Sequence, residues 1–182
     1  MALALITGAG ARSGIGLACA RALGRAGFDL AITATTGRIQ ARAAELMAEG
    51  FRVTAHQGDL TDPVAVARLC SAVGPVEVLV NNAGMGSVGA PAEQVSFLDL
   101  DPDQWRRAMD ASLTTAVLVT RAFLPAMVAR GRGRVIMMAS VTGPFVSNPG
   151  EAAYSAAKAG MVGLTHALAL EVAAKGVTVN AV

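Results

Sequence analysis

The stretch from Ala2 to Leu23 constrains the fold more than any other part of the sequence. An apolar run of strand length leads into a glycine-rich loop, and apolar residues then recur at helical spacing. In a parallel α/β sheet, this order of strand, glycine turn and helix start is where a dinucleotide binds. Glycines let backbone N–H groups approach a pyrophosphate, and the helix N-terminus favours an anion. Taken alone, the loop also fits an ordinary tight turn. Its four glycines are Gly8, Gly10, Gly14 and Gly16.

Length and composition predict one domain built around a buried sheet. A chain of 182 residues can hold one sizeable core, so we expect a single domain over residues 1–182. Hydrophobic residues make up 53% of the chain and charged residues 15%, a balance that suits strands buried on both faces. The net charge is +2 without a run of Lys or Arg, so no nucleic-acid surface is predicted. The expected fold class is α/β, a doubly wound parallel sheet of the Rossmann type in three α/β/α layers.

The sequence predicts a soluble protein of the cytoplasm. Cys19 and Cys70 lack metal-ligand spacing, and we expect two small buried thiols in a reducing compartment and no metal site. No positively charged leader precedes the first apolar run, so secretion is not expected. Apolar helical stretches are interrupted by Lys158, His166 and Glu171, and no membrane-spanning helix is predicted.

The chain beyond this first stretch alternates between strand and helix patterns. After the first helix, strands are expected at 28–33, 52–56, 76–80, 134–139 and 177–182. Helices are expected at 39–49, from Asp62, from Asp101 through Met127, and at 152–174. Residues 85–100 show no clear period and are expected to form a loop at the lip of the binding site.

The segment Ala34–Arg38 predicts which nicotinamide cofactor fits. An NAD site needs a carboxylate about 20 residues beyond the glycine loop to hold the ribose 2′-hydroxyl, whereas a 2′-phosphate needs hydroxyls and a cation. No acid occurs between residues 30 and 44, and Thr35, Arg38 and the loop residue Arg12 could serve a phosphate. We therefore predict NADP(H) over NAD(H), although ordinary surface residues would look the same.

Polar residues follow two of the predicted strands, at the sheet edge where ligands collect. Asp59 and Leu60 come after the third strand, and Asp59 fits a turn residue equally well. Asn81 and Asn82 come after the fourth, where adjacent amides can stitch neighbouring strands together and present the backbone to a flat ring. His56 alternates with apolar neighbours and has no second ligand nearby, so we interpret it as a strand-end histidine.

Ser140, Tyr154 and Lys158 form the candidate catalytic group. Ser140 lies just past the fifth predicted strand, and Tyr154, the single tyrosine, precedes Lys158 by four residues. Residues four apart share a helix face, so the ammonium can approach the phenol. A neighbouring cation favours the phenolate and brings proton transfer within reach of neutral pH. A Tyr and a Lys at this spacing also occur by chance. The catalytic interpretation is supported by their position after a strand-end serine and a glycine-rich loop.

In this order, the motifs resemble the short-chain dehydrogenase/reductase family, and most of all its 3-oxoacyl-acyl-carrier-protein reductases. The resemblance implies an oxidoreductase that transfers a hydride between NADP(H) and a ketone or secondary alcohol. The matching motifs extend from the first predicted strand to the last residue of the sequence. The matching segments are Thr7-Gly8, Gly14-Ile15-Gly16, Asp59-Leu60, Asn81-Asn82-Ala83-Gly84, Ser140-Val141-Thr142-Gly143, Tyr154-Ser155-Ala156-Ala157-Lys158 and Val179-Asn180-Ala181-Val182.

The resemblance also implies a role for each matched residue. Tyr154 would be the general acid or base, Lys158 would hold the nicotinamide ribose, and Ser140 would hydrogen-bond the substrate oxygen. The cofactor carries the hydride, so the protein orients the reactants and supplies the proton. Besides Tyr154 and Lys158, the implied cofactor contacts are Gly8, Gly14, Ile15, Gly16, Asp59, Leu60, Asn81, Ala83 and Gly84.

Three features depart from the family pattern. Five residues separate Gly8 from Gly14 where three are usual, and Arg12 and Ser13 are the candidates for the contact made by this enlarged loop. Ser112 stands where the family has a catalytic asparagine that helps hold a water, so a slower proton relay is expected. The chain also stops before the family's substrate-covering segment, so we expect the C-terminal part of the fold to be missing and the last strand to be an open sheet edge.

Small residues along the helix 152–174 predict either a subunit interface or burial within the monomer. Together with the Trp105 helix, this helix could form a four-helix interface across a two-fold axis, so a homodimer or homotetramer is expected. Apolar Val141, Phe145 and Val146 beside the site predict a small-molecule substrate with an apolar body. Two alternatives stay open, a catalytically weak NADP(H) sensor and a structural subunit of the same fold.

Overall fold

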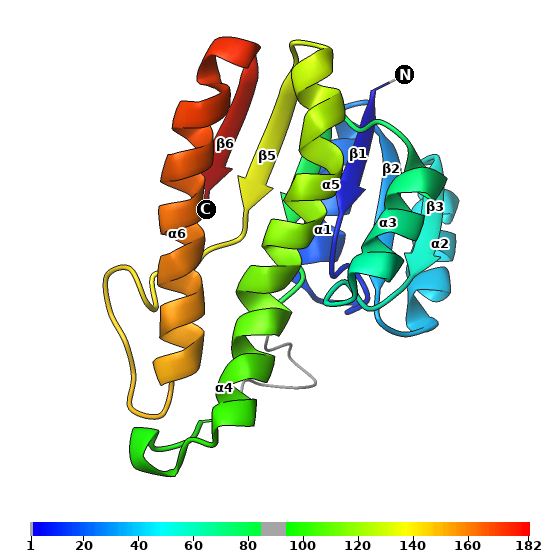
Figure 1. The fold of residues 1–182 in the computed structure, drawn as a ribbon. Coiled ribbons are helices and arrows are strands. Elements are labelled where there is room, and N and C mark those ends of the chain that lie inside the picture. Colours follow the sequence, from blue (N-terminus) through cyan, green and yellow to red (C-terminus); the bar gives the residue numbers. More distant parts are fainter. Residues whose placement is uncertain (1, 85–93) are drawn as a thin grey trace.

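A computed structural model of the chain describes residues 2–84 and 94–182 (Figure 1). Within these residues, six parallel strands form one sheet in the order β3-β2-β1-β4-β5-β6. The order reverses between β1 and β4, and this switch point is where doubly wound sheets bind ligands. The predicted Rossmann-type α/β fold is therefore confirmed. The strands are β1 (Leu3–Ile6), β2 (Asp29–Ala34), β3 (Val53–Gln57), β4 (Val78–Asn81), β5 (Gly133–Met137) and β6 (Val177–Ala181).

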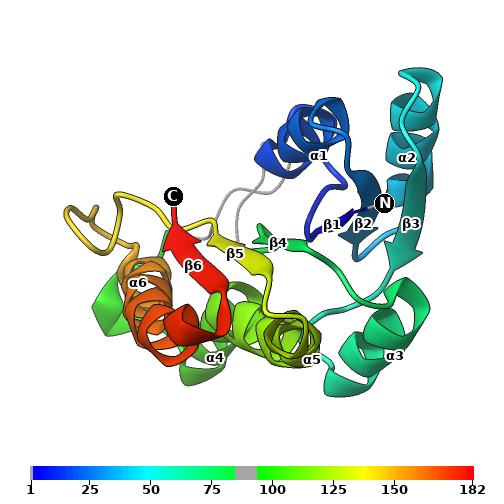
Figure 2. The ribbon, with the colours of Figure 1, turned by 90° about the horizontal axis from the view of Figure 1, so that it is seen from above.

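Helices cover both faces of the sheet, which gives the predicted three layers (Figure 2). One face carries α1 (Ile15–Arg25) and α2 (Arg38–Ala48). The other carries α3 (Pro63–Val73), α4 (Pro102–Met109), α5 (Thr115–Ala129) and α6 (Ala152–Val172). Three short turns complete the described part of the chain, η1 (Phe97–Asp99), η2 (Asp110–Thr114) and η3 (Ala173–Lys175).

The alternation of side chains along each strand divides the core in two, because neighbouring residues point to opposite faces. Leu5 of β1 packs in the cluster that includes Phe123 of α5. Its neighbour Ile6 packs in the cluster that includes Leu17 of α1. The strands β1, β2 and β4 thus contribute buried residues to both clusters, which explains their nearly continuous apolar runs in the sequence.

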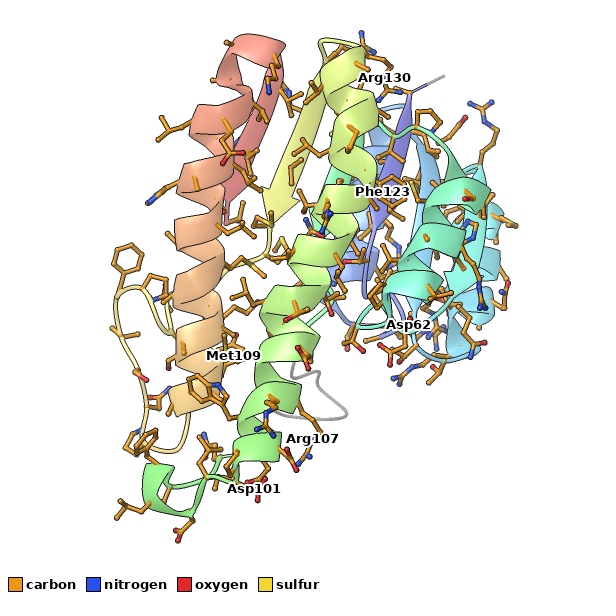
Figure 3. All side chains as sticks on the ribbon, viewed as in Figure 1. Asp62, Asp101, Arg107, Met109, Phe123 and Arg130 are labelled. Atoms are coloured by element: carbon orange, nitrogen blue, oxygen red, sulfur yellow. The ribbon has the colours of Figure 1, made fainter. Side chains whose placement is uncertain are left out.

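The predicted element starts are confirmed where a capping residue marks them. Asp101, at the start of α4 (Figure 3), accepts a hydrogen bond from the N–H of Asp103, and its own N–H donates one to Gln104 Oε1. Asp62 accepts from the N–H of Val64 in the same way. Such caps satisfy donors that have no partner in the first turn. Elsewhere the bounds differ from prediction by one or two residues, as in β4 and β5.

The expectation that no helix reaches membrane-spanning length is wrong for the helix that was predicted from Asp101 through Met127. Residues Pro102–Ala129 form a continuous helix of 28 residues that is long and apolar enough to cross a membrane, by length and composition only. The charges on which the expectation rested lie in α6. In the structure α5, the second part of this helix, packs against β4 and β5, and its buried residues include Ala116, Val119, Phe123 and Met127.

Two further predictions are modified by the structure. Cys19 and Cys70 are half-buried rather than fully buried, and this burial raises the pKa of both thiols. Of the loop predicted at 85–100, residues 85–93 lie outside the described residues. The part from 94 onward contains η1 and reaches the segment before α6, because the N–H of Val95 donates to the carbonyl of Gly150 at 3.0 Å.

Phe123 tests this description of the core. It lies on α5 (Figure 3) and is 1% exposed. Phe123→Ala should lower the free energy of unfolding by about 3–5 kcal/mol, because the substitution leaves a cavity. Leu170→Ala on α6, at a side chain 84% exposed, is the control and should change it by less than about 0.5 kcal/mol. Urea unfolding followed by circular dichroism measures both, and equal effects would contradict this core.

Candidate functional site

A cavity of about 430 Å³ lies at the carboxyl ends of β1 to β4, at the switch point of the sheet. Seven predicted site residues line it, namely Gly8, Thr35, Arg38, Asp59, Leu60, Ala83 and Gly84. The structure adds eight lining residues that the sequence did not single out as site residues: Gly10, Ala11, Thr33, Ala34, Gly58, Thr61, Ala111 and Thr115.

The fully buried hydroxyl of Thr7 ties the end of β1 to the end of β4. Thr7 Oγ1 donates to the carbonyl of Val80 at 3.2 Å and accepts from the N–H groups of Asn82 and Ala83 at 3.0 and 2.9 Å. Asn82 Nδ2 donates in turn to the carbonyls of Thr7 and Gly8, both at 3.0 Å. The predicted stitching role of the strand-end amides is confirmed for Asn82, and these bonds hold the cavity floor.

Asn81 and His56 lie away from this cavity. Asn81 is buried, and its Nδ2 donates to Thr120 Oγ1 at 2.8 Å, so its side chain joins β4 to α5. His56 Nε2 lies 3.1 Å from Thr54 Oγ1 on the same strand, and partial burial lowers the pKa of His56. The Asn81 side chain therefore ties a strand to a helix, and the His56 side chain contacts its own strand. The sequence placed them near a strand end but did not reveal the direction in which they point.

Missing Cβ atoms permit the close approach of the glycine loop to β4. Gly8 has φ +69°, and a Cβ there would lie 2.7 Å from the Cα of Ala83. A Cβ at Gly16 would lie 2.6 Å from Asn82 Nδ2. A side chain at either position would push the loop away from the strand and break the bonds around Thr7.

The additional residues of the enlarged loop project outward. The loop turns back where the N–H of Gly14 donates to the carbonyl of Ala11 at 3.1 Å. Arg12 and Ser13 within this turn are exposed, and Ile15 is exposed at the start of α1. These residues are not among those that line the cavity. The side chain of Arg12 instead lies against α2, with Nε 3.4 Å from Glu45 Oε1.

Asp59 combines the two interpretations that its position allowed. Its Oδ1 accepts from the N–H of Thr61 at 2.9 Å and from the Thr61 hydroxyl at 2.7 Å, which is a turn arrangement. The same bonds hold the pKa of Asp59 below its usual value. Asp59 and Thr61 also line the cavity, so this turn presents a carboxylate and a hydroxyl there. An Asp followed two residues later by Thr is the signal that could have found Thr61.

Tyr154 and Lys158 face each other on α6, as predicted from their spacing. Lys158 is 6% exposed, and its Nζ lies 5.8 Å from the centroid of the Tyr154 ring. The ammonium donates to the carbonyl of Met138 at 2.6 Å, just past β5. Burial lowers the pKa of Lys158, because the charged form loses water.

Gly84 connects this pair to the cavity. It lines the cavity, and a Cβ built on it would lie 3.8 Å from Lys158 Nζ and 3.6 Å from Ser112 Oγ. Ser112 is fully buried in η2, a π-helical turn between α4 and α5. Turns of this kind are frequent at functional sites. The apolar pattern gave no sign of it, because the pattern continues across the turn.

Ser140 belongs to a loop that packs tightly against α6. Its Oγ accepts from the N–H of Thr142 at 3.1 Å. Gly143 has φ +106°, and a Cβ there would lie 2.3 Å from the carbonyl oxygen of Ser155 and 3.0 Å from the nitrogen of Ala159. The loop can therefore lie beside the Tyr154 and Lys158 pair only because this residue has no side chain.

The chain is similar to known proteins over almost its whole length. The family model for short chain dehydrogenases matches residues 2–182. Oxidoreductase UcpA of Escherichia coli (strain K12) is 43% identical over 183 residues, which cover 98% of this chain and 66% of that protein. This chain thus spans about two thirds of the length of that curated relative.

Two solved structures that resemble the chain were determined with nucleotide. A variant of actinorhodin polyketide ketoreductase with NADPH has a TM-score of 0.90 at 37% identity, covering 99% of this chain and 68% of that one. A metagenomic short-chain oxidoreductase in complex with NADP has a TM-score of 0.87 at 34% identity, covering 99% and 79%.

Gly143→Ala tests the packing of the Ser140 loop. The new methyl group would collide with α6 at a backbone conformation that alanine disfavours, so the free energy of unfolding should fall by about 2–4 kcal/mol. Gly163→Ala, within α6, is the matched control, because no atom other than the helix's own backbone lies within 4 Å of its Cβ position. It should be neutral or stabilising by up to about 1 kcal/mol. Thermal and urea unfolding measure both, and a neutral Gly143→Ala would contradict this packing.

Proposed function

The chain belongs to the short-chain dehydrogenase family, and on that premise we propose that it is an NADP(H)-dependent oxidoreductase that interconverts a ketone and a secondary alcohol. One observation carries the proposal. A glycine-lined cavity at the switch point of the sheet borders, through Gly84, the buried ammonium of Lys158, and Lys158 faces Tyr154. A site that only binds nucleotide has no need of a phenol beside a buried cation.

The cavity fits a dinucleotide on three grounds. Gly8, Gly10 and Gly84 leave part of its wall free of side chains, so the backbone can contact a pyrophosphate there. The hydroxyl of Thr33 is buried with no hydrogen-bond partner in the described structure, and Thr33 lines the cavity, so a bound polar group would satisfy it. No side chain caps the start of α1 at Gly14, which leaves donors for an anion.

The choice of NADP(H) over NAD(H) rests on the end of β2. Thr35 and Arg38 line the cavity there, and together they offer a hydroxyl and a cation to a 2′-phosphate. The two nucleotide-bound relatives described above hold NADP or NADPH, which supports the same choice. Arg12 and Ser13, on the exposed turn of the loop, would add to this phosphate site.

Bound NADPH would supply the hydride. In reduction, Tyr154 would donate its phenolic proton to the carbonyl oxygen, and in oxidation it would accept the proton from the alcohol. Ser140 would hydrogen-bond the same oxygen. Lys158, anchored by the carbonyl of Met138, would bind the nicotinamide ribose and stabilise the phenolate that forms when the proton leaves.

Substrate, assembly and location remain part of this proposal. Val141, Phe145 and Val146 are exposed on the loop beside Ser140, which supports a small-molecule substrate with an apolar body. Ala157 and Gly160 of α6 already pack within the chain, Gly160 against Leu113, so burial accounts for part of the small-residue face. A homodimer or homotetramer in the cytoplasm is what we propose from the family.

Tyr154→Phe is the test of the proposed function. Reduction of a panel of β-keto esters and cyclic ketones with NADPH should slow by about 10²–10⁴-fold in kcat, because the proton donor is lost. The affinity for NADPH should change far less than kcat, since the ring is retained and only one hydroxyl is lost. Equal rates for the two proteins would overturn the enzyme proposal. NADPH binding without turnover in either would favour a sensor, and no binding at all would leave a structural subunit.

Ser112 is the feature that favours the weaker alternative, a sensor with little activity. Because serine is shorter than asparagine, it should hold the water that serves Lys158 less well. Ser112→Asn should therefore raise kcat, by about tenfold or less. Ser112→Ala is the matched variant and should lower it, and a melting curve for each controls for packing in this buried turn. Unchanged turnover in Ser112→Asn would contradict the role given to this residue.

A further inference from the structure

The carboxylate of Glu45 on α2 lies at the centre of three arginines. Arg42 Nη2 is 2.7 Å from Glu45 Oε1, and Arg12 Nε is 3.4 Å from the same oxygen. Arg21 Nη2 is 3.9 Å from Oε2. Arg42 belongs to the preceding turn of α2, Arg21 to α1 and Arg12 to the enlarged glycine loop. One carboxylate therefore links the loop to both helices on this face of the sheet.

Arg12 is the member of this cluster that can leave most easily. Its side chain is 79% exposed and its contact is long, whereas the side chain of Arg42 is 14% exposed and closely bound. Exposed ion pairs contribute little, because water screens the charges and two long side chains must be ordered. If Arg12 moves away, Arg42 and Arg21 still neutralise Glu45. Arg12 can therefore leave Glu45 at small cost.

The cavity wall is close to Arg12. Gly10 lines the cavity, and a Cβ on it would lie 3.5 Å from Arg38 Nε, so Arg38 packs on this wall. Arg12 follows Gly10 by two residues, which places its Cα within about 7 Å of the Gly10 Cα. An anion bound beside Arg38 would therefore lie near Arg12, and it would compete with Glu45 for that guanidinium.

We propose that Glu45 is a positioning residue that sets how strongly the protein prefers NADP(H) to NAD(H), by competing with the 2′-phosphate for Arg12. The inference rests on the proposed NADP(H) function. A 2′-phosphate gains Arg12 only after the contact with Glu45 breaks, so Glu45 weakens the binding of NADP(H). NAD(H) carries no phosphate at that position and does not draw on Arg12. Glu45 therefore leaves NAD(H) binding unchanged.

The experiment is a double-mutant cycle read as dissociation constants for NADPH and NADH, measured by calorimetry. Glu45→Gln should tighten NADPH by about two- to fivefold and leave NADH unchanged. In an Arg12→Ala background, Glu45→Gln should have no effect on either. Glu49→Gln is the matched control. Glu49 lies one turn after Glu45, at the C-terminal end of α2, and its Oε1 lies 2.8 Å from Arg21 Nε. This substitution should leave both constants unchanged.

Different outcomes would contradict the role of Glu45 and the proposed NADP(H) function. A Glu45→Gln effect that persists without Arg12 would show a general charge effect and overturn the competition, as would an equal effect on NADH. An Arg12→Ala protein that binds NADPH as tightly as wild type would also overturn it, while the NADP(H) function stands. A wild-type protein that binds neither nucleotide would remove the function itself. If Glu45→Gln does not fold, Glu45→Asp should shift NADPH binding in the same direction.

Discussion

The cavity exists because the loop after β1 and the end of β4 approach each other at the distance of a hydrogen bond. Three bonds converge on the hydroxyl of Thr7, and two more run from the Asn82 amide to the carbonyls of Thr7 and Gly8. Strand ends leave backbone groups without ladder partners, and these bonds satisfy them. The approach requires that Gly8 and Gly16 carry no Cβ. The glycine loop and the end of β4 therefore form the floor of the site together.

Two cationic side chains near the cavity differ in their exposure to solvent: Lys158 is buried and Arg12 is exposed. Lys158 is buried and held by the carbonyl of Met138, so it has one position, beside the ring of Tyr154. Arg12 is exposed and shares Glu45 with two other arginines, so it can exchange partners at little cost. A fixed buried charge suits a proton-transfer site, where geometry must not vary. An exposed charge suits recognition of a ligand that binds and leaves.

Local patterns predicted most of the fold and the part of the site that lies at strand ends. The cavity is lined by Asp59, Ala83 and Gly84, as the positions after β3 and β4 indicated, because parallel strands end at one edge. The turn η2 was not predicted, since the buried positions continue across it at helical spacing, from Ala108 through Ser112 to Ala116. The extent of the helix Pro102–Ala129 was predicted within two residues, but not that it is long and apolar enough to cross a membrane, because the interrupting charges all lie in α6.

Residue order alone settled the alternation of strands and helices, the glycine loop and the spacing of Tyr154 and Lys158, because each depends on neighbours within one or two turns of chain. Tertiary structure decided which way each strand-end side chain points, so that Asn82 stitches the floor while Asn81 turns to α5. It also decided that α6 leaves no room for a side chain at Gly143, and that Arg12 contacts Glu45. These contacts join segments that are far apart in the sequence. They form only when the helices pack against the sheet, so residue spacing could not predict them.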